Sequence, residues 1–158
     1  MSSTDVSGET TDQAESALGV DMNLEVVTLP VADVDRAKAF YQSLGWRLDI
    51  DLVVSDQVCS VQLTPPHSGC SIQFGKGRTA AEPGSAQAMI LVVKDIDAAR
   101  KNLINRGIDV SEVQEMKPPG FDAPGRSYFA RASFSDPDGN GWELQEITTR
   151  LPGRTWEH

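Results

Sequence analysis

The chain has 158 residues, of which 39% are hydrophobic, and its formal net charge is −9. That length suits one domain with a single core, and that hydrophobic content excludes a wholly disordered chain. Residues 1–21 carry five acidic residues and no Lys or Arg, so the remainder is only mildly acidic. Mild acidity disfavours nucleic acid and anionic membranes as partners. No apolar run reaches the roughly 18 residues that span a bilayer, and we expect a cytoplasmic protein.

Residues 1–21 are rich in Ser, Thr, Asp, Glu and Gly. Such a composition buries too little apolar surface to offset the entropy lost on ordering. We therefore predict a disordered acidic tail over 1–21, one domain over 22–150 and a short C-terminal tail over 151–158. Cys59 and Cys70 lack the spacing of a redox or zinc motif, so we expect both to be reduced.

An internal repeat follows the tail. Residues 26–45 align with residues 88–107 at a constant offset of 62 without a gap. Six positions are identical, pairing Leu29 with Leu91, Val31 with Val93, Asp33 with Asp95, Asp35 with Asp97, Ala37 with Ala99 and Gly45 with Gly107. A repeat of this kind indicates a duplicated structural unit. We predict two modules, 22–75 and 87–150, with a linker over 76–86.

Each module contains one helix with signals at both ends. Asp33 and Asp95 can accept backbone N–H bonds as N-caps, and Gly45 and Gly107 stand where a left-handed residue ends a helix. Between them, apolar residues recur at steps of three and four, which predicts one buried face. They are Val34, Ala37, Tyr41 and Leu44 in the first helix and Ile96, Ala99 and Leu103 in the second.

Short runs rich in β-branched residues predict the strands. They cover residues 26–31, 46–52, 57–64 and 70–74 in the first module and 89–93, 109–114, 127–134 and 142–147 in the second. With the helices, the order of elements is βαβββ, twice.

Residues 135–144 read SDPDGNGWEL. With the tandem βαβββ order and the Leu-x-Val-x-Asp lead into each helix, this run resembles the vicinal oxygen chelate superfamily, which includes glyoxalase I, bleomycin-resistance proteins and extradiol dioxygenases. The resemblance covers about residues 23–150. It implies an α+β fold whose tandem modules form a curved mixed-sheet cup with the helices on its outer face. The superfamily contains isomerases, epimerases, dioxygenases, thiol transferases and metal-free drug binders, so the fold does not fix the function.

Metal-dependent members hold one divalent ion with two side chains from each module. The resemblance places these positions at Val26, Gln73, Ala88 and Glu143. Valine and alanine offer no lone pairs, and one carboxylate with one amide is a poor ligand set for a transition metal. We therefore expect no metal and no other cofactor, and we expect His67, in a Pro-rich loop, to be solvated.

The run from Asp136 to Gly141 also matches the start of a calcium-binding loop. The bidentate Glu that such a loop requires at its twelfth position is Ile147 here. We therefore predict a hairpin turn, with Gly139 supplying a positive φ.

Strand alternation assigns side chains to the cup. If Glu143 faces the cup, so does Gln145, whereas Trp142 and Leu144 face the helices. The strand residues predicted to bind a ligand are Val26, Thr28, Gln73, Ala88, Ile90, Glu143 and Gln145. None of them is Lys or Arg, so an apolar or aromatic molecule should fit best.

The second module is longer by about eight residues, in or near 116–126. This Pro- and Gly-rich segment is either a lid over the cup or a solvated loop, and it adds Phe121, Asp122 and Arg126 to the ligand-binding candidates. Tyr128 is a further candidate. It is three residues from Arg131 on a predicted strand, so only one of the two should reach the cup.

The sequence thus favours a metal-free, glyoxalase-like protein that binds a small, largely apolar or aromatic molecule in the sheet cup. The alternative is a metal-independent isomerase, lyase or hydrolase in which Glu143 is the catalytic acid or base, with help from Gln73, Tyr128 or the 117–126 loop. A metal-dependent glyoxalase or dioxygenase is the third possibility. Because the superfamily is often dimeric, we expect a homodimer.

Overall fold

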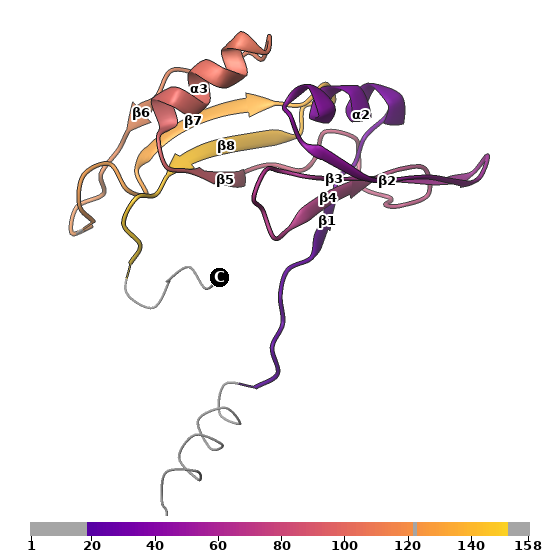
Figure 1. Ribbon diagram of the computed structural model, residues 1–158, viewed down its shortest axis with the longest axis horizontal. Helices are drawn as coiled ribbons and strands as arrows, with labels where there is room; N and C mark the ends of the chain where they lie inside the picture. Colours follow the sequence, from indigo (N-terminus) through magenta and orange to yellow (C-terminus); the bar gives the residue numbers. More distant parts are fainter. Residues whose placement is uncertain (1–18, 122, 152–158) are drawn as a thin grey trace, which may run out of the picture.

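The two halves of the chain fold with the same order of elements (Figure 1). The computed structural model describes residues 19–121 and 123–151. The first module comprises β1 (Val26–Thr28), α2 (Val34–Ser43), β2 (Arg47–Ser55), β3 (Val58–Thr64) and β4 (Ser71–Phe74). The second comprises β5 (Met89–Val93), α3 (Ile96–Asn105), β6 (Gln114–Glu115), β7 (Ala130–Ser135) and β8 (Gly141–Glu146). The βαβββ order predicted for each module is confirmed.

Each module builds one four-stranded mixed sheet. The strand orders are β1-β4-β3-β2 and β5-β8-β7-β6. In both sheets the first strand runs parallel to the last, and the other pairs are antiparallel. Both helices lie on the same side of the molecule, above the sheets in Figure 1, and the opposite faces of the sheets form its concave side. The arrangement is the predicted α+β fold with helices on the outer face.

Both helices begin and end as their sequences predict. The carboxylates of Asp33 and Asp95 each accept a backbone N–H three residues further on, at 3.1 and 3.0 Å. Gly45 and Gly107, at the other ends, have φ of +84° and +86°, a conformation that costs glycine little.

The turn between β7 and β8 connects the two modules. Buried Asp136 accepts hydrogen bonds from the Tyr41 hydroxyl of α2 and from the Asn140 amide, both at 2.8 Å. Asn140 also donates to the Pro30 carbonyl at 2.9 Å, and Asp138 forms a 3.0 Å ion pair with an arginine of α2. The run that resembled a calcium loop is therefore a turn that joins the modules.

Two predicted strands of the second module are shorter in the structure. The strand expected over 109–114 is reduced to β6, and the strand expected over 127–134 begins only at Ala130. Residues 125–129 make a turn instead, and Tyr128 has a positive φ of 75°, which no extended strand accommodates. The backbone N–H of Tyr128 still donates to the Glu146 carbonyl of β8 at 2.8 Å, so the end of this turn stays attached to the sheet.

Candidate functional site

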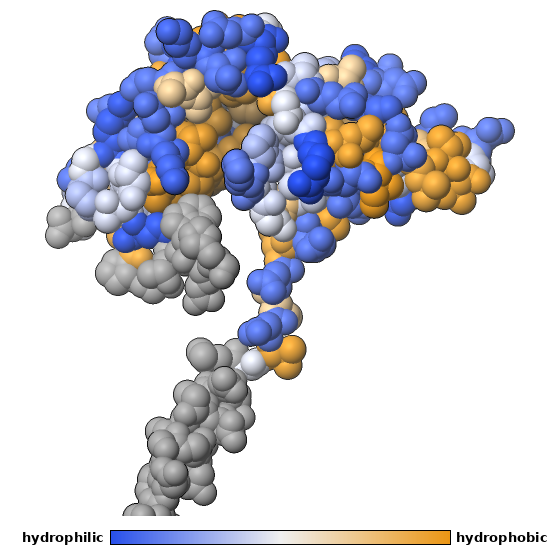
Figure 2. Space-filling view, viewed as in Figure 1, coloured by the Kyte–Doolittle hydropathy of each residue, from blue (hydrophilic) through white to orange (hydrophobic). Residues whose placement is uncertain are grey.

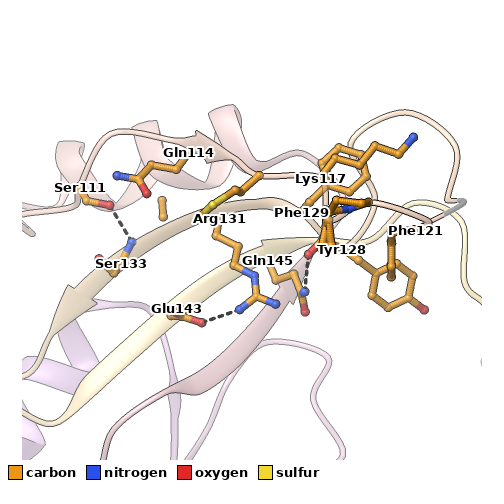
Figure 3. Close-up of a pocket in the computed structure, with 14 residues that line it drawn as sticks. Ser111, Gln114, Lys117, Phe121, Tyr128, Phe129, Arg131, Ser133, Glu143 and Gln145 are labelled. Atoms are coloured by element: carbon orange, nitrogen blue, oxygen red, sulfur yellow. Dashed lines mark hydrogen bonds and ion pairs between the residues drawn. The ribbon is translucent and has the colours of Figure 1, made fainter.

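A pocket of about 760 Å³ lies on the concave side of the second module. Its floor is β7 and β8, and its wall is the segment between β6 and β7 (Figure 3). The apolar lining residues are Met116, Pro118, Pro119, Phe121, Phe129 and Ala132. The polar ones are Ser111, Gln114, Lys117, Tyr128, Arg131, Ser133, Glu143 and Gln145. Apolar side chains gather on the hollowed underside of this module (Figure 2).

Strand alternation determines which side chains reach the floor. In the antiparallel register of β7 and β8, Arg131 lies opposite Gln145 and Ser133 lies opposite Glu143. Their neighbours Trp142 and Leu144 point the other way, into the hydrophobic core. Glu143 and Gln145 therefore face the pocket, as the alternation predicts.

An ion pair lies on this floor. Arg131 Nη1 donates to Glu143 Oε2 at 3.1 Å, and the two side chains are 46% and 32% exposed. The expectation that only one of Tyr128 and Arg131 would reach the cup is wrong, because both line the pocket. Tyr128 precedes β7 and has a positive φ, so the alternation of the strand does not extend to it.

Aromatic rings form the wall beside the ion pair. The Phe121 ring packs edge to face on Tyr128 and on Phe129, with centroids 5.8 and 6.2 Å apart. Lys117 Nζ lies 5.5 Å from the centre of the Phe129 ring, a cation–π distance. The Gln145 amide donates to the Tyr128 carbonyl at 2.6 Å and so ties the floor to the wall. The wall thus adds a cation, Lys117, that the strand assignment did not include.

Arg126 anchors this wall from behind. Its guanidinium pairs with Asp97 of α3 and with Glu115 of β6, both at 2.8 Å, and approaches Glu146 of β8 at 3.9 Å. The hydrogen bond from Arg126 lowers the pKa of the Asp97 carboxyl below its usual range. Arg126, a predicted ligand-binding residue, is therefore directed to three carboxylates and does not line the pocket.

Other predicted ligand-binding residues lie elsewhere on the two sheets. Val26, Thr28 and Gln73 belong to the first module, where the Gln73 amide donates to the Thr28 hydroxyl at 2.8 Å. On β5, Ile90 pairs in register with Glu143 and is 47% exposed, outside the pocket lining. Ala88 precedes β5 with a positive φ of 59°. Asp122 lies outside the described residues. The ligand roles of these residues stay predictions.

The four positions that hold a divalent ion in metal-dependent relatives do not fit one here. Val26 and Ala88 provide no donor atom, the Gln73 amide is bonded to Thr28, and Glu143 is paired with Arg131. Over residues 19–121 and 123–151, no three His, Cys, Asp or Glu side chains are grouped so as to hold a metal. His67 is exposed in the loop between β3 and β4.

Several pocket residues were absent from the predicted ligand-binding set, among them Lys117, Phe129 and Ser133, and Arg131 was considered only as the alternative to Tyr128. Ser133 and Arg131 follow from the strand register once Glu143 is placed, because paired residues share a face. The eight-residue excess of the second module already pointed to the segment that carries Lys117.

Comparisons with known proteins agree with this architecture. A family model described as "Glyoxalase/Bleomycin resistance protein/Dioxygenase superfamily" matches residues 23–144. A crystal structure of TnmS3, described as an antibiotic binding protein from Streptomyces sp. CB03234, is 26% identical with a TM-score of 0.65, covering 81% of this chain and 98% of that one. A superfamily member from Sphaerobacter thermophilus is 27% identical with a TM-score of 0.62, covering 80% and 98%. No curated protein matched the chain.

The described part of the chain contains no helix that is both long and apolar enough to span a membrane.

Proposed function

Because the chain belongs to the glyoxalase/bleomycin resistance protein/dioxygenase superfamily, we propose that it is a metal-free binding protein for a small, largely apolar or aromatic organic molecule. The observation that carries this proposal is the wall of three aromatic rings, Phe121, Tyr128 and Phe129, around a cavity of about 760 Å³. Ligand sites of roughly 300–1,000 Å³ with mostly apolar walls and a few polar groups are typical for drug-sized molecules.

The role we propose is sequestration of such a molecule. TnmS3 is described as an antibiotic binding protein, and this chain shares its fold over 98% of the TnmS3 chain. A binding protein needs a preformed cavity and no reactive group. The contacts of Arg126 and Gln145 hold the aromatic wall in place without a ligand, which supports a preformed cavity.

Calorimetric titration of protein treated with EDTA tests the proposal. An aromatic probe such as 2-naphthamide should bind, and glucose 6-phosphate should not. Replacing Phe121 with Ala removes a ring from the wall. The affinity for the aromatic probe should fall about tenfold, because roughly 1.4 kcal/mol of apolar contact is lost. Ile104→Ala is the matched control, because Ile104 is a 42% exposed apolar residue on α3 outside the pocket lining. Loss of aromatic binding on metal removal would contradict the proposal.

A second candidate function is a metal-independent enzyme that uses Glu143 as acid or base. It is favoured by one observation: Glu143 is the one carboxylate among the described residues that line the pocket. After incubation, mass spectrometry of the recovered ligand separates the two functions. A binding protein returns the ligand unchanged. An enzyme returns product, and Glu143→Gln abolishes that conversion.

We also infer that two copies associate through the β2–β3 hairpin. Strand β2 is an edge strand, and Leu52, Val53 and Val54 on it are 53%, 72% and 64% exposed. Figure 2 shows an apolar patch at the far end of the first module, where the β2–β3 hairpin lies. Exposed apolar side chains on an unpaired edge strand are unfavourable in water, and a second copy of the same hairpin covers them by a two-fold contact.

A further inference from the structure

We propose that the Arg131–Glu143 ion pair selects neutral aromatic ligands that carry a hydrogen-bond acceptor next to a hydrogen-bond donor. Aromatic amides are the simplest molecules of this class. The proposal rests on the proposed binding function and narrows it from aromatic molecules in general to one chemical class.

Both members of the ion pair are placed where a ligand in the pocket can form hydrogen bonds with them. Arg131 comes from β7 and Glu143 from β8, and the register makes them diagonal neighbours on the pocket floor. Nη1 of Arg131 is bonded to Glu143 at 3.1 Å. Within the described residues, the other guanidinium N–H groups and the second Glu143 oxygen form no further hydrogen bond, and Figure 3 shows both groups at the floor of the pocket. One donor and one acceptor thus stand side by side.

The charges of the pair work against a charged ligand. A carboxylate that approaches Arg131 also approaches Glu143, which repels it, and an ammonium group meets the opposite conflict. Because the ion pair is neutral as a whole, a charged ligand of either sign gains little attraction from it and still loses part of its own hydration. A neutral amide can accept from Arg131 and donate to Glu143 without separating them. Lys117 also lines the pocket, but its ammonium group lies on the wall, 5.5 Å from the centre of the Phe129 ring.

The surroundings of the pair set the shape of the ligand. The aromatic wall of Phe121 and Tyr128 rises beside the floor (Figure 3), and the Gln145 amide is already bonded to the Tyr128 carbonyl. A flat ligand can therefore place its rings against the wall while one polar edge reaches the ion pair. This arrangement favours rings that carry the amide directly over ligands whose polar group is on a long chain.

Calorimetric titration with three naphthalenes of similar size tests the proposal. The first is 2-naphthamide, which presents a hydrogen-bond acceptor and a donor. The others are 2-naphthoate, an anion, and 2-naphthylmethylammonium, a cation. The wild-type protein should bind the amide about tenfold more tightly than either ion. Arg131→Gln leaves Glu143 alone and should shift the preference to the ammonium. Glu143→Gln leaves Arg131 alone and should shift it to the carboxylate.

Controls keep the outcome interpretable. Lys38→Gln removes an ion pair with Asp51 on the first module and should leave the order of the three affinities unchanged. Because both members of the pocket pair are partly exposed, their replacement should cost little stability, which thermal unfolding checks. If Arg131→Gln does not fold, Arg131→Lys retains the charge and should keep the preference for the amide over the ammonium.

Binding of all three probes with an order that neither substitution changes would overturn this proposal and leave the binding function standing. Failure of the wild-type protein to bind any of the three would instead overturn the proposed function, and this proposal with it.

Discussion

Tyr41 shows how a single residue supports both the core and the junction between the modules. Its side chain is fully buried, its ring contacts Trp46 and Trp142 at 5.1 and 6.1 Å, and its hydroxyl donates to Asp136 and accepts from Trp142 Nε1. Burial, and then the nearby charge of Asp136, raises the pKa of Tyr41 far above its usual value of about 10. The hydroxyl is therefore held neutral in the folded protein.

This shift makes stability depend on alkaline pH. The unfolded chain releases the Tyr41 proton above about pH 10, whereas the folded protein retains it, so the stabilisation is complete below pH 10 and is lost as pH rises. At pH 11 the wild type should have lost about 1.4 kcal/mol more than Tyr41→Phe, relative to pH 8. Denaturant unfolding at both pH values measures this difference, with Tyr128→Phe as the control that retains the wild-type loss. Equal losses in wild type and Tyr41→Phe would contradict the account.

Residue by residue, the sequence could predict the floor of the pocket better than its wall. Glu143 and Gln145 follow from the period of a strand, and the same period fails at Tyr128 because a positive φ ends the strand there. The ion pair with Arg131 depends on the register between β7 and β8, which a single sequence does not contain. The ion pairs of Arg126 could not be predicted because its three carboxylate partners come from α3, β6 and β8, which are distant in sequence.

At the scale of elements, the segment between β6 and β7 depends on Arg126 for its position. Arg126→Gln removes the ion pairs with Asp97 and Glu115 and should release the wall while leaving the two sheets intact. Backbone amides of residues 116–129 should then exchange with deuterium about tenfold faster, because local opening costs less. Lys38→Gln is the control for loss of a surface ion pair. Unchanged exchange in Arg126→Gln would contradict this role of Arg126 and leave the wall to its aromatic contacts and to the hydrogen bond from Gln145.

The helices could be predicted more accurately than the strands, because local sequence signals define the helix ends whereas tertiary pairing defines the strand ends. Both helices could be predicted because caps and terminal glycines are local signals, which the structure confirms at Asp33 and Gly45. The strand expected over 109–114 was too long because its pairing with β7 is irregular. There the Ser111 hydroxyl takes the place of a backbone acceptor for the Ser133 N–H at 2.9 Å. The replacement of a backbone acceptor by a side-chain hydroxyl depends on a tertiary contact, which the strand propensity of the sequence does not reveal.

For the whole molecule, Asn140 is central to the junction between the modules. It is fully buried, donates to the Pro30 carbonyl and the Asp136 carboxylate, and accepts from the Ala86 N–H at 3.1 Å. Asn140→Ala removes all three hydrogen bonds, leaves the Ala86 N–H without its acceptor, and should destabilise the protein by about 2–4 kcal/mol in chemical denaturation. Asn105→Ala, at the exposed end of α3, should change the free energy of unfolding by less than about 1 kcal/mol. Similar small effects of both substitutions would contradict a structural role for the turn.

The inferred dimer is also a property of the whole molecule. Light scattering at micromolar concentration should give twice the 17.1 kDa mass of one chain. Val53→Lys places a charge on the exposed edge strand and should shift the mass to that of a monomer. A monomeric wild type would refute the dimer.

The central claim is that the second module binds an aromatic molecule without a metal. Mapping of backbone amide NMR shifts during titration with 2-naphthamide, in excess EDTA, tests it most directly. The account predicts saturable shifts concentrated in residues 111–133 and at Glu143 and Gln145, with little change on β1 to β4. Shifts confined to the first module, or binding that disappears when EDTA is added, would contradict it.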